Sequence, residues 1–166
     1  MIYRFLIFTV LALLSCNSSD KSIELEKTIQ FQDVAQIKAP AGMKLYEERK
    51  GRSPYQIYFS ENNELEIQFK HLNNFAREMP TLKEIYDRNA SQNNIQILES
   101  SLREINGQSF VIHRTEGVND YMNYHSLQLA TIHEGRIVQC LIRTLTKNKE
   151  NWEETMEAMA ETIQLK

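Results

Sequence analysis

The stretch YQIYFSENNELEIQF, residues 55–69, carries the pattern that decides the fold. Its first half has Tyr55, Ile57 and Phe59 at every second position, and its second half repeats this with Leu65, Ile67 and Phe69. A two-residue period is typical of β-strands that keep one face on a core and the other in water. Asn62-Asn63 lies between the two halves, where a tight turn is needed. The stretch therefore predicts a β-hairpin.

Further strands are expected on both sides of this hairpin. Residues 36–40 and 43–48 precede it, and residues 95–100 and a strand around Phe110 and Ile112 follow, the latter introduced by Ile105-Asn106-Gly107. A longer pair of strands spans residues 121–133 and 136–146, closed by Glu134-Gly135.

Two helices interrupt the strands. Thr81 and Glu84 have the spacing of a capping box, and Pro80 stands directly before them. Near the end, Trp152, Met156, Met159 and Ile163 form an apolar stripe, and glutamates occupy the other sides. We interpret the adjacent pair Glu153-Glu154 as solvated surface. The order of strands, helix, strands and helix predicts an α+β domain, a mainly antiparallel sheet covered by helices.

The composition limits the function. The chain has 166 residues, 42% of them hydrophobic, which suits one folded domain, expected over residues 30–166. With 19 basic and 22 acidic side chains, the net charge is −3, so no nucleic-acid partner is expected.

The N-terminus has its own pattern. Arg4 precedes an uncharged apolar run, and Leu13-Leu14-Ser15-Cys16 follows, with polar residues after it. The run is too short to span a bilayer. This segment resembles the signal of bacterial lipoproteins, with residues 1–15 as signal peptide and residues 16–29 as lipidated tether. The resemblance implies acyl chains such as palmitate on Cys16, a place in the cell envelope and, because Asn17 rather than aspartate follows, the outer membrane rather than the inner one.

The domain resembles the Mog/PsbP-like fold, an α/β/α sandwich found in many small bacterial lipoproteins. The matching features are Ala39-Pro40-Ala41-Gly42-Met43, the hairpin of residues 55–69, the helix after Pro80, Ile105-Asn106-Gly107 and the C-terminal helix. A cystatin-like or NTF-like sheet wrapped on a helix is the alternative, but such folds usually begin with their main helix. The PsbP-like resemblance implies an accessory or binding protein without shared catalytic residues.

Catalytic patterns are not evident, and we expect no enzyme, no cofactor and no metal site. The sequence has no nucleophile elbow and no phosphate loop. His125 and His133 share a strand face but lie ~26 Å apart, although His113 on a neighbouring strand is placed to approach one of them. We interpret Cys140 as a buried structural thiol, and we interpret the loop of residues 49–52 as a basic turn that keeps the surface soluble.

One segment favours binding. Residues 117–124 join two strands and place Tyr121, Met122 and Tyr124 at a hairpin tip, where such side chains serve as contact anchors unless they pack onto the sheet. The leading hypothesis is a lipid-anchored, non-catalytic module that binds another envelope protein. An immunity protein against an envelope-delivered toxin and a carrier of a small hydrophobic ligand remain as alternatives.

Overall fold

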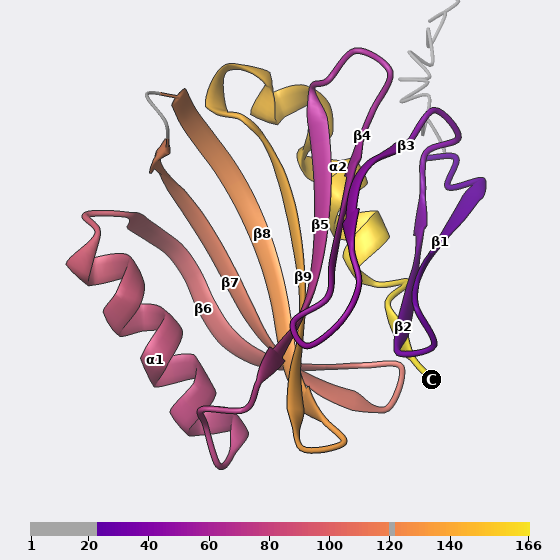
Figure 1. Ribbon diagram of the computed structural model, residues 1–166. Coiled ribbons are helices and arrows are strands. Elements are labelled where there is room, and N and C mark those ends of the chain that lie inside the picture. Colours follow the sequence, from indigo (N-terminus) through magenta and orange to yellow (C-terminus); the bar gives the residue numbers. More distant parts are fainter. Residues whose placement is uncertain (1–22, 120–121) are drawn as a thin grey trace, which may run out of the picture.

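The computed structural model describes residues 23–119 and 122–166, which form two antiparallel sheets and two α-helices (Figure 1). The strands are β1 (Lys27–Phe31), β2 (Ala35–Ala39), β3 (Lys44–Arg49), β4 (Tyr55–Phe59), β5 (Leu65–Asn73), β6 (Gln96–Ile105), β7 (Gln108–Asn119), β8 (Met122–His133), β9 (Arg136–Leu145) and β10 (Gln164–Leu165). The helices are α1 (Met79–Gln92), a 3-10 turn η1 (Thr146–Asn148) and α2 (Lys149–Ala160). These elements confirm the expected α+β class.

The large sheet separates two apolar layers. Its strand order is β3-β4-β5-β9-β8-β7-β6, and the smaller sheet has the order β1-β2-β10. On one face, the small sheet and α2 enclose the main core, where Phe31 stacks on Phe69 with ring centroids 5.3 Å apart. On the other face, α1 buries Leu82 against Val111 and Ile137. The result is the expected sandwich, with helices on both sides of a mainly antiparallel sheet (Figure 1).

The turns follow the local sequence closely. Asn106 and Gly107 have φ values of 52° and 77°, and Glu134 and Gly135 have 49° and 72°. Two consecutive positive φ angles define the turn that suits the twist of a tight hairpin, and glycine takes the second position without strain. Asn63 also has a positive φ, 57°, as the expected turn after β4 requires.

Helix α1 begins earlier than the sequence predicted. It starts at Met79 with Glu78 as N-cap, and no side chain caps its first turn. Pro80 lies inside that turn, where its missing N–H costs no hydrogen bond because the first helical N–H groups have no partner within the helix. The predicted start at a Thr81 capping box is therefore wrong.

Segments near both ends of the chain pack onto the core. β1 begins at Lys27, three residues before the expected start of the domain, and Ile29 is buried in the main core. At the other end, Ile163 is buried as expected but follows the end of α2, and β10 then pairs with the start of β2. The predicted signal peptide and Cys16 lie outside the described residues.

The face of β4 that points into the main core is the opposite of the expected one. Tyr58 lies directly opposite Ile67 of β5, and directly opposed residues of a ladder share a face. Because Ile67 is buried in the main core, Tyr58 faces that core, while Ile57 and Phe59 lie half-buried on the face that carries α1. The position of the more apolar residues in this strand therefore did not reveal its inner face.

Candidate functional site

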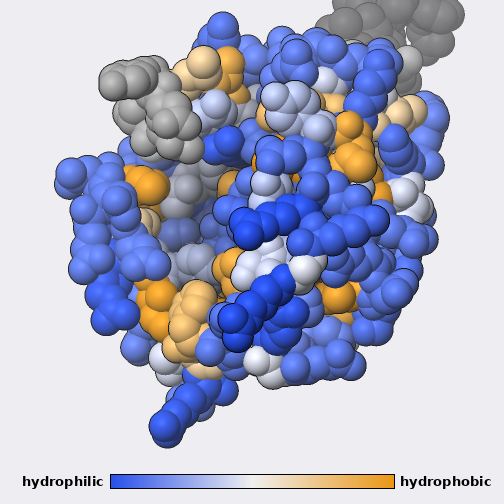
Figure 2. All heavy atoms as spheres, viewed as in Figure 1, coloured by the Kyte–Doolittle hydropathy of each residue, from blue (hydrophilic) through white to orange (hydrophobic). Residues whose placement is uncertain are grey.

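Among the described residues, the α1 side of the large sheet is only partly covered. Helix α1 lies along β6 and β7, and Figure 2, viewed from this side, shows the surface hollowed between the helix and the strands β5 and β4. A cavity of about 360 Å³ opens here. We call it the furrow, and its lining includes Ile95, Thr115, Gly117, Tyr124, Ser126, Gln128 and Arg143.

The floor of the furrow follows from strand register. Arg143 of β9 lies opposite Ser126 of β8, which lies opposite Thr115 of β7. These short or polar side chains occupy one row of the sheet, and α1 has already ended at Gln92, so in the described part of the chain no helix covers the row. Gly117 lies beside this row, and a Cβ atom there would lie 3.1 Å from Cγ1 of Ile95. Glycine therefore allows the segment after α1 to approach the sheet and close one wall of the furrow.

Arg143 is the charged residue of this row. Its Nε donates a hydrogen bond of 2.8 Å to Oε2 of Glu66, and its Cζ lies 4.4 Å from the ring centroid of Tyr124. Glu66 is 5% exposed, so the ion pair is largely withdrawn from water. Nearby, burial and the positive charge of Arg143 lower the pKa of Lys70. The guanidinium is thus held between a carboxylate and an aromatic ring, with its plane fixed.

Two smaller hollows adjoin the furrow. One, of about 150 Å³, lies beside Tyr86 and His113 and shares Gln128 with the furrow. The other, of about 220 Å³, is bounded by Phe59, Met122 and Leu145 and shares Tyr124 and Arg143 with it. Together they form an elongated depression across the open face.

The predicted contact residues lie at one end of this depression. Met122 is 52% exposed, and Tyr124 is half-buried with its hydroxyl 3.7 Å from Sδ of Met122. Tyr121 lies outside the described residues. Sequence reasoning did not single out Arg143, Gln128 or Glu66, because a depression built from β4, β5, β7, β8 and β9 leaves no local motif.

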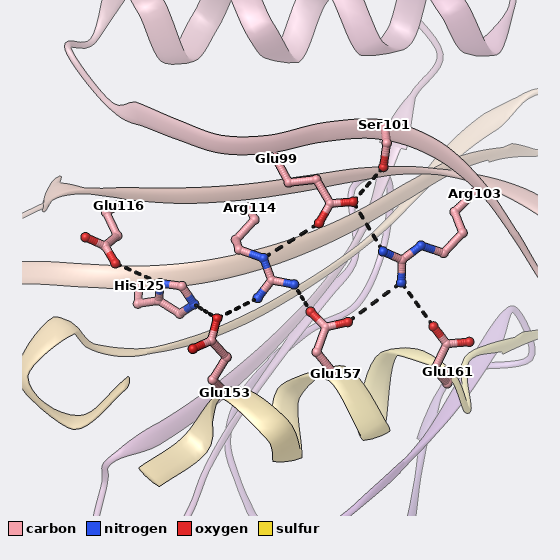
Figure 3. A network of polar contacts seen from close by, with 9 residues as sticks. All are labelled: Glu99, Ser101, Arg103, Arg114, Glu116, His125, Glu153, Glu157 and Glu161. Atoms are coloured by element: carbon pink, nitrogen blue, oxygen red, sulfur yellow. Dashed lines mark hydrogen bonds and ion pairs between the residues drawn. The ribbon is translucent and has the colours of Figure 1, made fainter. Parts of the chain in front are cut away.

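The opposite face of the same strands carries a network of ion pairs (Figure 3). Arg114 of β7 is 13% exposed and contacts Glu99 of β6 together with Glu153 and Glu157 of α2. Arg103 likewise contacts Glu99, Glu157 and Glu161. Glu153, interpreted with Glu154 as solvated surface, contacts Arg114, and together with Glu157 and Glu161 it fastens the helix to the sheet, whereas Glu154 is exposed.

The histidines do not converge. His113 lies opposite Gln128 and faces α1, whereas His125 lies opposite Glu116 and faces α2, so these two rings do not approach each other. His125 is 1% exposed, and its Nδ1 lies 3.1 Å from Oε1 of Glu116. Burial lowers the pKa of His113. Within residues 23–119 and 122–166, no group of three or more histidine, cysteine or acidic side chains is placed to hold a metal ion.

Cys140 and the basic loop differ in burial, one lying in the core and the other at the surface. Cys140 is completely buried in the main core, and this burial raises the pKa of its thiol. The basic loop of residues 49–52 is exposed, and the Arg52 carbonyl accepts a hydrogen bond from Nη2 of Arg136. In the part of the chain that the structure describes, neither helix is long and apolar enough to cross a bilayer.

Comparisons with known proteins place the fold. No family model matches the sequence, and no curated protein matches it. Among solved structures, CyanoP, the cyanobacterial PsbP of Synechocystis sp. PCC 6803, is similar with a TM-score of 0.65 and 11% identity, over 84% of this chain and 92% of that one.

Two further structures are similar at lower scores. PA94 from Pseudomonas aeruginosa, a putative regulator of unknown function, has a TM-score of 0.56 and 9% identity, over 82% of this chain and 94% of that one. LpqN of Mycobacterium tuberculosis, which is involved in cell envelope biogenesis, has a TM-score of 0.55 and 11% identity, over 79% of this chain and 82% of that one. The chain therefore has the mainly antiparallel α+β fold of PsbP-like proteins.

Proposed function

We propose that this protein is a lipoprotein of the bacterial cell envelope, anchored through acyl chains on Cys16, whose domain is a non-catalytic module that binds another envelope protein. The lipoprotein-like signal around Cys16 supports the anchor. Two or more acyl chains hold a protein firmly at a bilayer, whereas one chain binds only marginally. The similarity to LpqN fits an envelope location.

The observation that carries the binding function is the furrow with Met122 and Tyr124 at its end. An exposed methionine and a half-buried tyrosine beside a cavity provide contact area at a small cost in side-chain entropy. The Tyr124 ring is held by Arg143 before any partner arrives, which reduces the ordering that binding requires. The polar side chains in the mixed lining of the furrow, such as Ser126, Gln128 and Arg143, favour this function over carriage of a small hydrophobic ligand.

Crosslinking capture from the native envelope tests the proposal. The tagged full-length protein is compared with a Cys16→Ala variant and with a Met122→Ala, Tyr124→Ala double variant. Phe75→Ala is the matched control, because Phe75 is 53% exposed but lies in the segment between β5 and α1, away from the furrow. Captured proteins are identified by mass spectrometry.

We expect one dominant envelope protein with the native chain and with Phe75→Ala. The double variant should lose it while its thermal midpoint stays nearly unchanged, and Cys16→Ala should lose it because the chain leaves the membrane. Capture that survives the double variant would contradict a role for this end of the furrow. Capture of a toxin would instead select the immunity hypothesis.

A further inference from the structure

The furrow has a specific electrostatic character. Among the described residues that line the 360 Å³ cavity, Arg143 is the one with a formal charge, although the whole chain has a net charge of −3. Its Nε is engaged by Glu66, which leaves the terminal Nη groups of the guanidinium available to a ligand. A guanidinium held by a carboxylate and a ring suits the planar recognition of a second carboxylate.

Gln128 adds a neutral donor. Its Nε2 is buried and has no hydrogen-bond partner among the described residues, and the side chain lies where the furrow meets the hollow beside Tyr86. A buried amide donor without an acceptor is costly, so a ligand carbonyl at this point is favourable. The furrow thus offers a donor at some distance from its charged group.

The hollow beyond Arg143 has the opposite character. Phe59, Met122 and Leu145 line it with apolar side chains, and Tyr46 packs edge-on against Phe59 with centroids 5.3 Å apart. The carboxylates of Glu64 and Glu66 also border it, but they already accept hydrogen bonds from Trp152 and Arg143. Its volume of about 220 Å³ suits one apolar side chain. Because this hollow shares Arg143 and Tyr124 with the furrow, a single ligand can reach the apolar lining and the guanidinium together.

We propose that the furrow binds the carboxyl terminus of a partner polypeptide that ends on an apolar residue. The terminal carboxylate pairs with the Nη groups of Arg143, the last side chain enters the apolar hollow, and the preceding backbone extends toward Gln128. This inference rests on the proposed binding function and names the chemistry of its partner. An isolated small carboxylate would engage Arg143 alone and leave the elongated depression unused.

Isothermal titration of the full-length lipidated protein in detergent micelles tests this. The probes are acetyl-Ala-Ala-Leu with a free carboxylate, the same peptide with a carboxamide terminus, acetyl-Ala-Ala-Ser with a free carboxylate, and acetate. We expect the leucine acid to bind at least ~10-fold more tightly than the carboxamide, because the charge-assisted pair is lost, and more tightly than the serine peptide.

A paired variant separates recognition from folding. Arg143→Gln alone leaves the buried Glu66 carboxylate unpaired and can unfold the domain. Glu66→Gln with Arg143→Gln removes both charges at similar volume, and circular dichroism confirms that the fold is kept. In this double variant the preference for the acid over the carboxamide should disappear, while Phe75→Ala should retain it.

Equal affinity for acid and carboxamide, or no binding of the leucine acid up to about 5 mM, would overturn the inference. So would acetate binding as tightly as the peptide, since the site would then be one for a free anion. Envelope capture distinguishes a failure of the carboxyl-terminal chemistry from a failure of the proposed binding function. A partner lost in the Met122→Ala, Tyr124→Ala variant, together with peptides that fail to bind, refutes only the carboxyl-terminal chemistry, whereas no captured partner refutes the proposed function itself.

Discussion

Replacing Arg114 with methionine tests how α2 is held on the sheet (Figure 3). The side chain is 13% exposed and contacts three glutamates, whose side chains are 31%, 47% and 32% exposed. Methionine keeps much of the apolar volume but removes the charge. The three carboxylates would then face one another without their shared cation.

The magnitude follows from the burial of the partners. An exposed ion pair contributes about 0–1 kcal/mol, and breaking a buried one costs about 3–5 kcal/mol. Arg114 is largely but not fully buried and its partners are partly hydrated, so we expect a loss of about 2 kcal/mol in the free energy of unfolding. For a domain of about 140 residues the unfolding entropy is about 0.3 kcal/mol/K, so the thermal midpoint should fall by about 7 °C.

Arg103→Met is the matched control. Arg103 also contacts three glutamates, but its side chain is 36% exposed, so a loss of about 0.5 kcal/mol is expected. Calorimetry of both variants, with a double-mutant cycle against Glu157→Gln, measures the difference. If Arg114→Met costs no more than Arg103→Met, the partly buried network does not fasten the helix and the reasoning is refuted.

Acid should remove the effect. Burial on its own raises the pKa of Glu99, but the hydrogen bond from Ser101 and the charges of Arg103 and Arg114 bring it below its ordinary value. A carboxyl group whose pKa is lowered by folding stabilises the protein above its unfolded pKa, and that stability is lost as the pH falls through the folded pKa. The stability gap between native and Arg114→Met proteins should therefore be full near neutral pH and shrink below about pH 4.5.

Three other substitutions or treatments test the packing on the two faces of the large sheet. Gly117→Ala should lower the free energy of unfolding by about 1 kcal/mol, because the new Cβ atom would press against Ile95. In a denaturant titration, adding Ile95→Ala to the same chain should recover most of that loss in stability. Leu82→Ala should cost about 2–5 kcal/mol, because this completely buried side chain joins α1 to the sheet, and an unchanged midpoint would show that α1 is not packed there. Cys140 should react with a thiol reagent only as fast as the domain unfolds, because the thiol is fully buried and its pKa is raised, so fast labelling of the folded chain would contradict the packing.

Local patterns in the sequence were enough for most of the elements. Strand alternation in residues 65–69 and the Asn106-Gly107 and Glu134-Gly135 turns depend on neighbours within a few positions, and the structure confirms them. The start of α1 was mispredicted because Thr81 and Glu84 offer a capping box, while Pro80 is equally suited to the first turn of the helix.

The phase of β4 and the role of the α2 glutamates needed the tertiary structure. In β4 the residue opposite Ile67 faces the main core, and that residue is Tyr58 because of the register with β5. Glu157 became a partner of Arg114 because α2 lies across β7, a contact between residues far apart in the chain. Neither pairing leaves a periodic trace in the sequence.

The sequence by itself determined the class of the domain, its hairpins and its two helices, because turn chemistry and hydrophobic period act over a few residues. It also contains the lipoprotein-like segment at Cys16. The furrow was decided only by tertiary structure. Its row of Glu66, Arg143, Ser126 and Thr115 comes from four strands brought together by long-range register, and α1 happens to end before it covers them.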